Sequence, residues 1–260
     1  MVVIAGSTHQ PAGGAPPPGL DPDRVPQVLR VVLVRHATAQ ATAQAPGSGV
    51  PIDRPLTSDG MSQADRLRWL NLFDLATGFY AGPEARMIGT LAPGATSRGR
   101  EVLNMAALAE TASGGWLPDE QFAEVIGRYF AHPAVVPAPG WESGSVAAQR
   151  FGSQVAALRA AHPPHVNRDR AVPGVVVVST GGRVAIAWLA SCLGWSGAAA
   201  ESAWRHLRNP DIAVVDLPKG EGNGSQAGLG WHGGANVNQA GLGWGGEAAR
   251  LIIPFGTLET

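Results

Sequence analysis

The feature that most constrains this 260-residue chain is an apolar run at residues 31–34 that ends abruptly in Arg35 and His36. Four branched apolar residues in a row are typical of a strand buried on both faces, as in a parallel sheet. An Arg and a His just past the carboxyl end of such a strand lie where open α/β sheets bind ligands. Arg brings a permanent charge and N–H donors that match phosphate, and His brings a nucleophile or proton carrier. The pattern alone also fits a surface Arg-His pair.

A second strand leads into a glycine turn. Residues 175–178 are four valines, followed by Ser179, Thr180, Gly181 and Gly182 and then by a predicted helix at residues 183–193. The first N–H groups of a helix have no partner within it, and the helix dipole is positive there. A strand, a glycine turn and a helix start therefore predict an anion-binding site.

The other predicted elements alternate between strands and helices. Thr57 is a suitable N-cap for a helix that reaches about residue 72. The remaining helices are expected at residues 84–91, 119–131 and 143–161, a short strand at 78–83, a mixed segment at 102–108, and a hairpin of 212–217 with 250–255.

Composition excludes several classes of protein. Hydrophobic residues make up 45% of the chain, which is enough for a sizeable core, and the formal net charge of -1 gives no reason to expect a nucleic-acid or acidic-membrane partner. Cys192 is the single cysteine, which excludes an intrachain disulfide and a metal site of several thiolates. Without a signal-like leader or a long apolar window, we expect a soluble cytoplasmic protein.

Glycine and proline mark two segments that fall outside the predicted elements. Residues 1–27 are predicted to be a flexible leader, and residues 28–260 to form one domain with a Gly-rich insert at about 219–249. The insert repeats Gln-Ala-Gly-Leu-Gly-Trp at residues 226–231 and 239–244. Two copies are too few for a solenoid, so we expect a duplicated flexible loop, with a Trp-bearing contact loop as the alternative.

Six short motifs follow one another along the chain. They are Arg35-His36-Ala37, Pro55-Leu56-Thr57 with Gly60 and Gln63-Ala64, Gly82-Pro83 with Arg86 and Thr90, Leu108 with Glu110 and Gly114, Gly140-Trp141-Glu142-Ser143 with Arg150, and Val178-Ser179-Thr180-Gly181-Gly182. Each motif alone is weak, but the ordered set, over about residues 28–217, resembles the histidine phosphatase superfamily, which includes the phosphoglycerate mutases.

The resemblance implies a fold and a reaction. The fold would be an α/β three-layer sandwich with a mostly parallel central sheet, as in phosphoglycerate mutases. His36 would attack the phosphorus of a small phosphorylated substrate, and Glu110 would protonate the leaving alcohol and then activate water. The phosphate-binding residues would be Arg35, Arg86, Thr180 and Gly181, with no metal and no organic cofactor.

Thr180 departs from the family pattern, because the second histidine of the family falls on this position. A threonine can donate one neutral hydrogen bond and no charge. Losing a charged donor costs about 2–4 kcal/mol of transition-state stabilisation, or roughly a 30- to 1000-fold loss of rate. The sequence therefore predicts a phosphomonoesterase, with a catalytically weakened binding or regulatory protein as the alternative and a repurposed pocket as a third.

A second departure from the family pattern is Thr42, which stands where phosphoglycerate mutases usually carry Asn and favours a phosphatase over a mutase. Two further properties stay open at this point. The identity of the substrate depends on Gly- and Pro-rich loops whose conformations the sequence does not predict. The oligomeric state is also open, with a homodimer as one possible form.

Overall fold

The computed structural model of the chain describes residues 28–40, 54–115, 117–167, 170–218, 249–253 and 255. The predicted leader, Thr42 and nearly all of the repeat-bearing insert lie outside these residues. The division into leader, domain and insert therefore stays a prediction.

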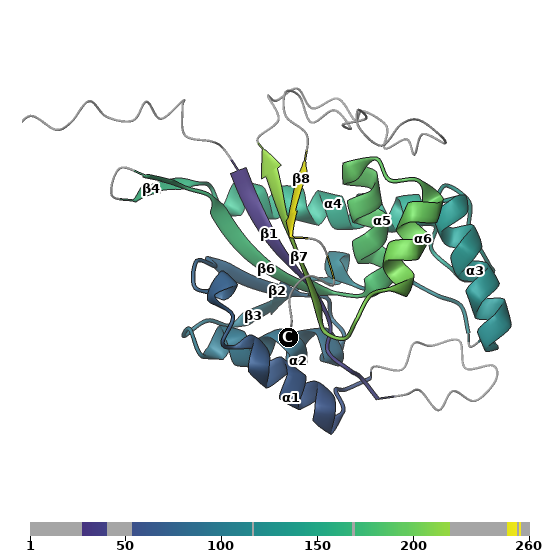
Figure 1. Cartoon of the computed structure of the whole chain (residues 1–260), viewed down its shortest axis with the longest axis horizontal. Coiled ribbons are helices and arrows are strands. Elements are labelled where there is room, and N and C mark those ends of the chain that lie inside the picture. The colour runs from purple at the N-terminus through teal and green to yellow at the C-terminus, as the bar shows by residue number, and fades with distance from the viewer. Residues whose placement is uncertain are drawn as a thin grey trace, which may run out of the picture.

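A six-stranded sheet with the order β3-β2-β6-β1-β7-β8 forms the centre of the fold (Figure 1). Successive pairs from β3 to β1 are parallel, whereas β7 is antiparallel to both of its neighbours. The mostly parallel sheet and the late hairpin, which is β7 with β8, are thus confirmed. The strands are β1 (Val28–Arg35), β2 (Gly78–Ala81), β3 (Val102–Asn104), β6 (Gly174–Thr180), β7 (Asp211–Pro218) and β8 (Arg250–Ile253).

Helices cover both faces of this sheet, which gives the expected three layers (Figure 1). One face packs against α1 (Ser58–Leu67) and α2 (Ala85–Thr96). The helices on the other face are α3 (Asp119–Ala131), α4 (Gly144–Ala161), α5 (Gly182–Leu193) and α6 (Gly197–Arg205).

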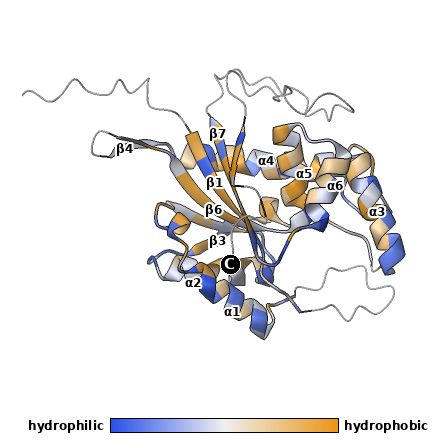
Figure 2. Ribbon diagram, in the orientation of Figure 1, coloured by the Kyte–Doolittle hydropathy of each residue, from blue (hydrophilic) through white to orange (hydrophobic). Residues whose placement is uncertain are grey.

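Strand β1 explains why the apolar run is uninterrupted. Side chains alternate along a strand, so Val31 and Leu33 enter the core under α3–α6, while Val32 and Val34 enter the core under α1 and α2. All four are fully buried. The central strands are accordingly hydrophobic in Figure 2, whereas the outward face of α1 is hydrophilic.

The last residues of two helices differ from the predicted ones. Helix α1 begins after its Thr57 cap but ends at Leu67 instead of about residue 72, because the chain turns into a 3-10 segment, η2 (Asn71–Phe73), that buries Phe73. Helix α2 continues past residue 91 and through Pro93 to Thr96, because Leu91 and Ala95 are buried in the core on that side.

The other helix predictions are close to the structure. Helices α3, α4 and α5 lie within one residue of the expected bounds, and Ser143 caps α4. The mixed segment becomes β3 followed by a 3-10 turn, η3 (Ala106–Leu108). Sequence reasoning missed α6 and a small antiparallel hairpin of β4 (His165–Asn167) with β5 (Arg170–Val172).

Candidate active site

The carboxyl ends of β1, β2 and β6 meet at one edge of the sheet. Arg35, the last residue of β1, lies opposite Thr180, the last residue of β6, and Ala81 of β2 lies opposite Ser179. The backbone N–H of His36 donates to the carbonyl of Thr180 at 3.2 Å. The strand ends that carry the sequence motifs therefore converge, as the sequence predicts.

His36 is buried, with 8% of its surface exposed, and its ring is held in one orientation. Nδ1 lies 2.8 Å from the carbonyl oxygen of Ala37. A carbonyl can only accept, so Nδ1 carries the proton and the lone pair is on Nε2. Burial lowers the pKa of His36 to about 4, and the charges of Arg86 and Arg35 act in the same direction. The imidazole is therefore neutral and nucleophilic at neutral pH.

The two predicted phosphate arginines each keep a buried donor without a partner in the described part of the chain: Arg35 Nε and Arg86 Nε. Arg35 Nη1 donates to the carbonyl of Leu207 at 2.7 Å, and a Cβ added at Gly182 would lie 3.3 Å from Arg35 Nε. Arg86 is 7% exposed, with Nη2 3.5 Å from Glu84 Oε1. An unpaired buried donor is costly, so two beside one imidazole indicate a site that an anion completes.

The Pro-Leu-Thr motif fixes the loop that follows His36. The N–H of Thr57 donates to the carbonyl of Thr38 at 3.0 Å, and the N–H of Thr38 donates to Gln63 Oε1 at 2.9 Å. A Cβ at Gly60 would overlap the Thr38 carbonyl oxygen. These three motif positions therefore hold the backbone that follows His36.

Thr90 joins this loop to the helix that carries Arg86. Its hydroxyl donates to the carbonyl of Arg86 at 2.6 Å and accepts the N–H of Ala37 at 2.8 Å. Thr90 is fully buried, so both bonds are shielded from water. The backbone that follows His36 and helix α2 at Arg86 are thereby held together.

Glu110 lies against the first turn of α5. Its carboxylate accepts the N–H groups of Thr111 at 2.7 Å, Val184 at 3.0 Å and Arg183 at 3.3 Å. Burial by itself raises the pKa of Glu110, but the charge of Arg183 and these N–H groups outweigh burial and lower the pKa to about 2. The anion that the α5 N-terminus holds in this structure is thus the Glu110 carboxylate.

Thr180 and Gly181 lie between Glu110 and the end of β1. The Thr180 hydroxyl donates to the carbonyl of Leu108 at 2.7 Å and is fully buried. In this geometry its proton is already used, so donation to a phosphate requires that bond to break. Gly181 is the N-cap of α5, and a Cβ there would overlap the Glu110 carboxylate.

Three charged residues at the site are absent from the predicted set. Arg54 precedes the Pro-Leu-Thr motif, and its pKa is lowered by burial and by the charges of Arg86 and Arg183. Glu84 Oε1 accepts the N–H of Glu110 at 3.1 Å and pairs with Arg86. Arg183 lies in the first turn of α5, and its Nε is 3.6 Å from Glu110 Oε2. Each of these three residues lies inside or next to a motif, and that position is the sequence signal that could have found them.

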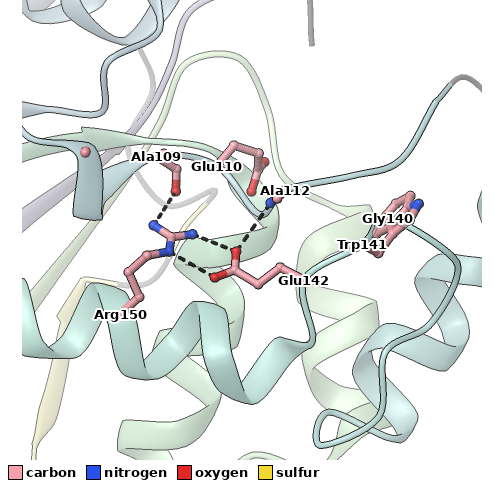
Figure 3. Close-up of a pocket in the computed structure, with 8 residues that line it drawn as sticks. Ala109, Glu110, Ala112, Gly140, Trp141, Glu142 and Arg150 are labelled. Atoms are coloured by element: carbon pink, nitrogen blue, oxygen red, sulfur yellow. Dashed lines mark hydrogen bonds and ion pairs between the residues drawn. The ribbon is translucent and has the colours of Figure 1, made fainter. Parts of the chain in front are cut away.

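A cavity of about 530 Å³ adjoins the site on the side of α4 (Figure 3). It shares Glu110 with the site, but His36 is not among its lining residues. Arg150 donates to both oxygens of Glu142 at 3.0 and 2.8 Å and to the carbonyl of Ala109 at 3.1 Å (Figure 3). Because these charges are already paired, the cavity offers less to an anion than the two arginines beside His36.

Two further properties of the described residues concern metal ions and membranes. No group of three or more His, Cys, Asp and Glu side chains in those ranges could hold a metal ion. None of the helices formed there has the length and apolar character that crossing a membrane requires.

Comparison with known proteins assigns the family. The family model for branch 1 of the histidine phosphatase superfamily matches residues 31–225, so the chain belongs to this superfamily. No curated protein matches the chain.

Solved structures show the same fold at low identity. A mycobacterial hydrolase shares 21% identity with a TM-score of 0.60, over 73% of this chain and 92% of its own. A mycobacterial glucosyl-3-phosphoglycerate phosphatase shares 19% with a TM-score of 0.59, over 73% and 91%. A phosphoserine phosphatase mutant from Entamoeba histolytica, in complex with phosphoserine, shares 13% with a TM-score of 0.54, over 73% and 94%. These likenesses establish the fold.

The depressed pKa of His36 predicts a stability effect with a defined pH window. The ordinary pKa of histidine is 6.5, so between pH 6.5 and about pH 4 the unfolded chain takes up a proton at His36 that the folded protein does not. The free energy of unfolding is therefore unaffected by this proton above pH 6.5. It falls by about 3 kcal/mol in all as the pH falls from 6.5 to about 4. Urea unfolding of the native chain and of His36→Asn at pH 7 and pH 4 measures it. An equal acid loss in both proteins would contradict the prediction.

Proposed function

We propose that the protein is a phosphomonoesterase that works through a phosphohistidine at His36. The observation that carries the proposal is a neutral imidazole, with its lone pair on Nε2, within the electrostatic influence of two arginines whose buried Nε groups have no partner in the described residues. Guanidinium donors match phosphate oxygens, and phosphoryl transfer depends mainly on positioning and on meeting the charge of those oxygens.

The reaction has two displacements. In the first, His36 Nε2 forms a bond to phosphorus as the ester P–O bond breaks, and the leaving oxygen takes a proton from the Glu110 carboxyl. In the second, Glu110 takes a proton from water, the resulting oxygen attacks phosphorus, and the P–N bond breaks. Inorganic phosphate and an alcohol leave, and His36 is again a neutral imidazole. Glu110 ends the second step as a carboxyl and loses its proton as phosphate departs, which returns it to the ionised state of the ligand-free site. Arg35 and Arg86 hold the phosphoryl oxygens throughout.

Glu110 begins this cycle ionised, because its pKa is about 2 in the ligand-free site. A phosphate dianion placed beside a carboxylate raises its pKa. We infer that substrate binding drives proton uptake by Glu110, so that the acid for the first step forms only when a phosphate is present. The substrate class suggested by this site is a small phosphate monoester, and the named activities of the two similar phosphatases are of that kind.

The experiment is a phosphate-release screen with the purified full-length chain. A panel of phosphomonoesters, including phosphoserine, sugar phosphates and p-nitrophenyl phosphate, is tested from pH 4 to pH 9 with EDTA present. Release of inorganic phosphate that is unaffected by EDTA supports the proposal. No release from any ester at any pH contradicts it.

A second candidate, a protein that binds phosphate esters without efficient turnover, is favoured by Thr180 alone. Its hydroxyl is committed to the carbonyl of Leu108 and supplies no charge. Thr180→His restores the family donor, so it should raise kcat roughly 30- to 1000-fold. Thr180→Val is the matched control, because it removes the bond to Leu108 and adds no donor. Turnover that begins only in Thr180→His would favour the binding protein over the enzyme.

A further inference from the structure

Arg183 contacts three groups that belong to the wall of the site. Its Nε lies 3.6 Å from Glu110 Oε2, and its Nη2 donates to the carbonyl of Thr111 at 3.2 Å. The guanidinium carbon lies 4.8 Å from the ring centroid of Trp141. The side chain of Arg183 is 13% exposed, as is that of Glu110, so water screens this ion pair weakly.

These contacts orient Arg183 away from the helix axis and toward Glu110. Trp141 packs against one side of the guanidinium, and the Thr111 carbonyl fixes one of its nitrogens. The contacts leave Nε directed at the carboxylate that also accepts two N–H groups from the first turn of α5. Arg183 and the helix terminus thus act on the same carboxylate.

We propose that Arg183 is a positioning residue that holds the Glu110 carboxylate seated on the first turn of α5, in place for proton transfer. The proposal rests on the proposed function, because proton transfer by Glu110 is part of that reaction. In this proposal Arg183 acts on the reaction through Glu110 and does not contact the reacting phosphate.

Several other charged or titratable groups interact with Glu110 or lie around it. They are Arg35 at the end of β1, His36 after it, Arg54 before the Pro-Leu-Thr motif, Glu84 with its ion-pair partner Arg86, Tyr129 of α3, Glu142 before α4, and Arg150 of α4. Arg183 differs from the other arginines because, within the described part of the chain, it alone forms an ion pair with the Glu110 carboxylate.

The test is a titration of Glu110 by carboxyl ¹³C NMR in the full chain without substrate, with Glu110→Gln to assign the signal. Removing an opposite charge at this distance raises the midpoint of a buried carboxylate by about one to three pH units. Arg183→Met should show that rise, and Arg183→Lys, which keeps the charge, should reverse most of it. Arg205→Met, which removes an exposed arginine paired with Glu201 on α6, is the matched control.

A kinetic readout accompanies the titration. In the pH profile of the rate of phosphoenzyme hydrolysis, the acid limb should lie at higher pH in Arg183→Met than in the native chain. The shift should equal that of the NMR midpoint in pH units, and Arg183→Lys should reverse most of it. An unchanged Glu110 midpoint in Arg183→Met overturns the proposal, because the backbone N–H groups alone would then hold the carboxylate. Absence of any phosphoenzyme in the native chain instead contradicts the proposed function, and the NMR midpoint still decides the action of Arg183 on Glu110.

Discussion

Replacing His36 with Ala should lower kcat by about 10⁴-fold or more and abolish the phosphoenzyme. The imidazole is the group with a free lone pair between Arg35 and Arg86, and removing a covalent nucleophile costs at least about 5.5 kcal/mol of transition-state stabilisation. Rapid quench with a ³²P-labelled ester at mildly alkaline pH, where phosphohistidine survives, measures both quantities. The labelled peptide should contain residue 36.

Binding should separate from chemistry in the same variant. Arg35 and Arg86 remain in place in His36→Ala, so the Kd for inorganic phosphate should change by less than about threefold. His132→Ala is the matched control, because His132 is an exposed histidine that follows the last turn of α3. Label in His36→Ala, or normal turnover, would show that another residue accepts the phosphoryl group.

Much of the fold could be predicted from local patterns in the sequence. The branched runs that became β1 and β6 are apolar without alternation because both of their faces are covered. The starts of α1 and α4 followed from side-chain caps at Thr57 and Ser143, which act on N–H groups three residues away. Interactions of such short range are visible in a sequence.

The parts that were missed depend on contacts between distant residues. The end of α1 is set by the burial of Phe73, and the length of α2 by a core that includes strands on both sides of it in the sequence. Helix α6 packs against α3, which lies far earlier in the sequence. The hairpin of β4 with β5 is a local exception: each strand has three residues, too few to show an alternating pattern.

At the site, too, some features could be predicted from the sequence and others could not. Parallel strands bring their carboxyl ends together, so the meeting of Arg35, His36 and Thr180 follows from topology. The directions in which the side chains point do not follow from topology. Arg183 turns toward Trp141 and Glu110, and the Thr180 hydroxyl turns toward Leu108, because of contacts more than forty residues away in the sequence. The residue types at a site were therefore predictable, while their hydrogen-bond partners were not.

Arg86→Met should lower kcat/KM about 10²- to 10³-fold, the second largest effect that we expect. Arg86 is buried, its Nε has no partner in the described residues, and it would bind phosphoryl oxygens whose charge must be met in the transition state. Steady-state kinetics with the best ester of the screen measures the loss. Arg86→Lys keeps the charge but not the planar fork, so it should recover only part of the activity.

A second readout separates this role from damage to the fold. The charge of Arg86 contributes to the low pKa of His36, so its removal should raise that pKa from about 4 and move the acid limb of kcat/KM to higher pH. Arg66→Met, which removes an exposed arginine in the last turn of α1, should change neither quantity. If Arg86→Met kept full activity, or lost it with the acid limb unmoved, Arg86 would not be the second phosphate arginine beside His36.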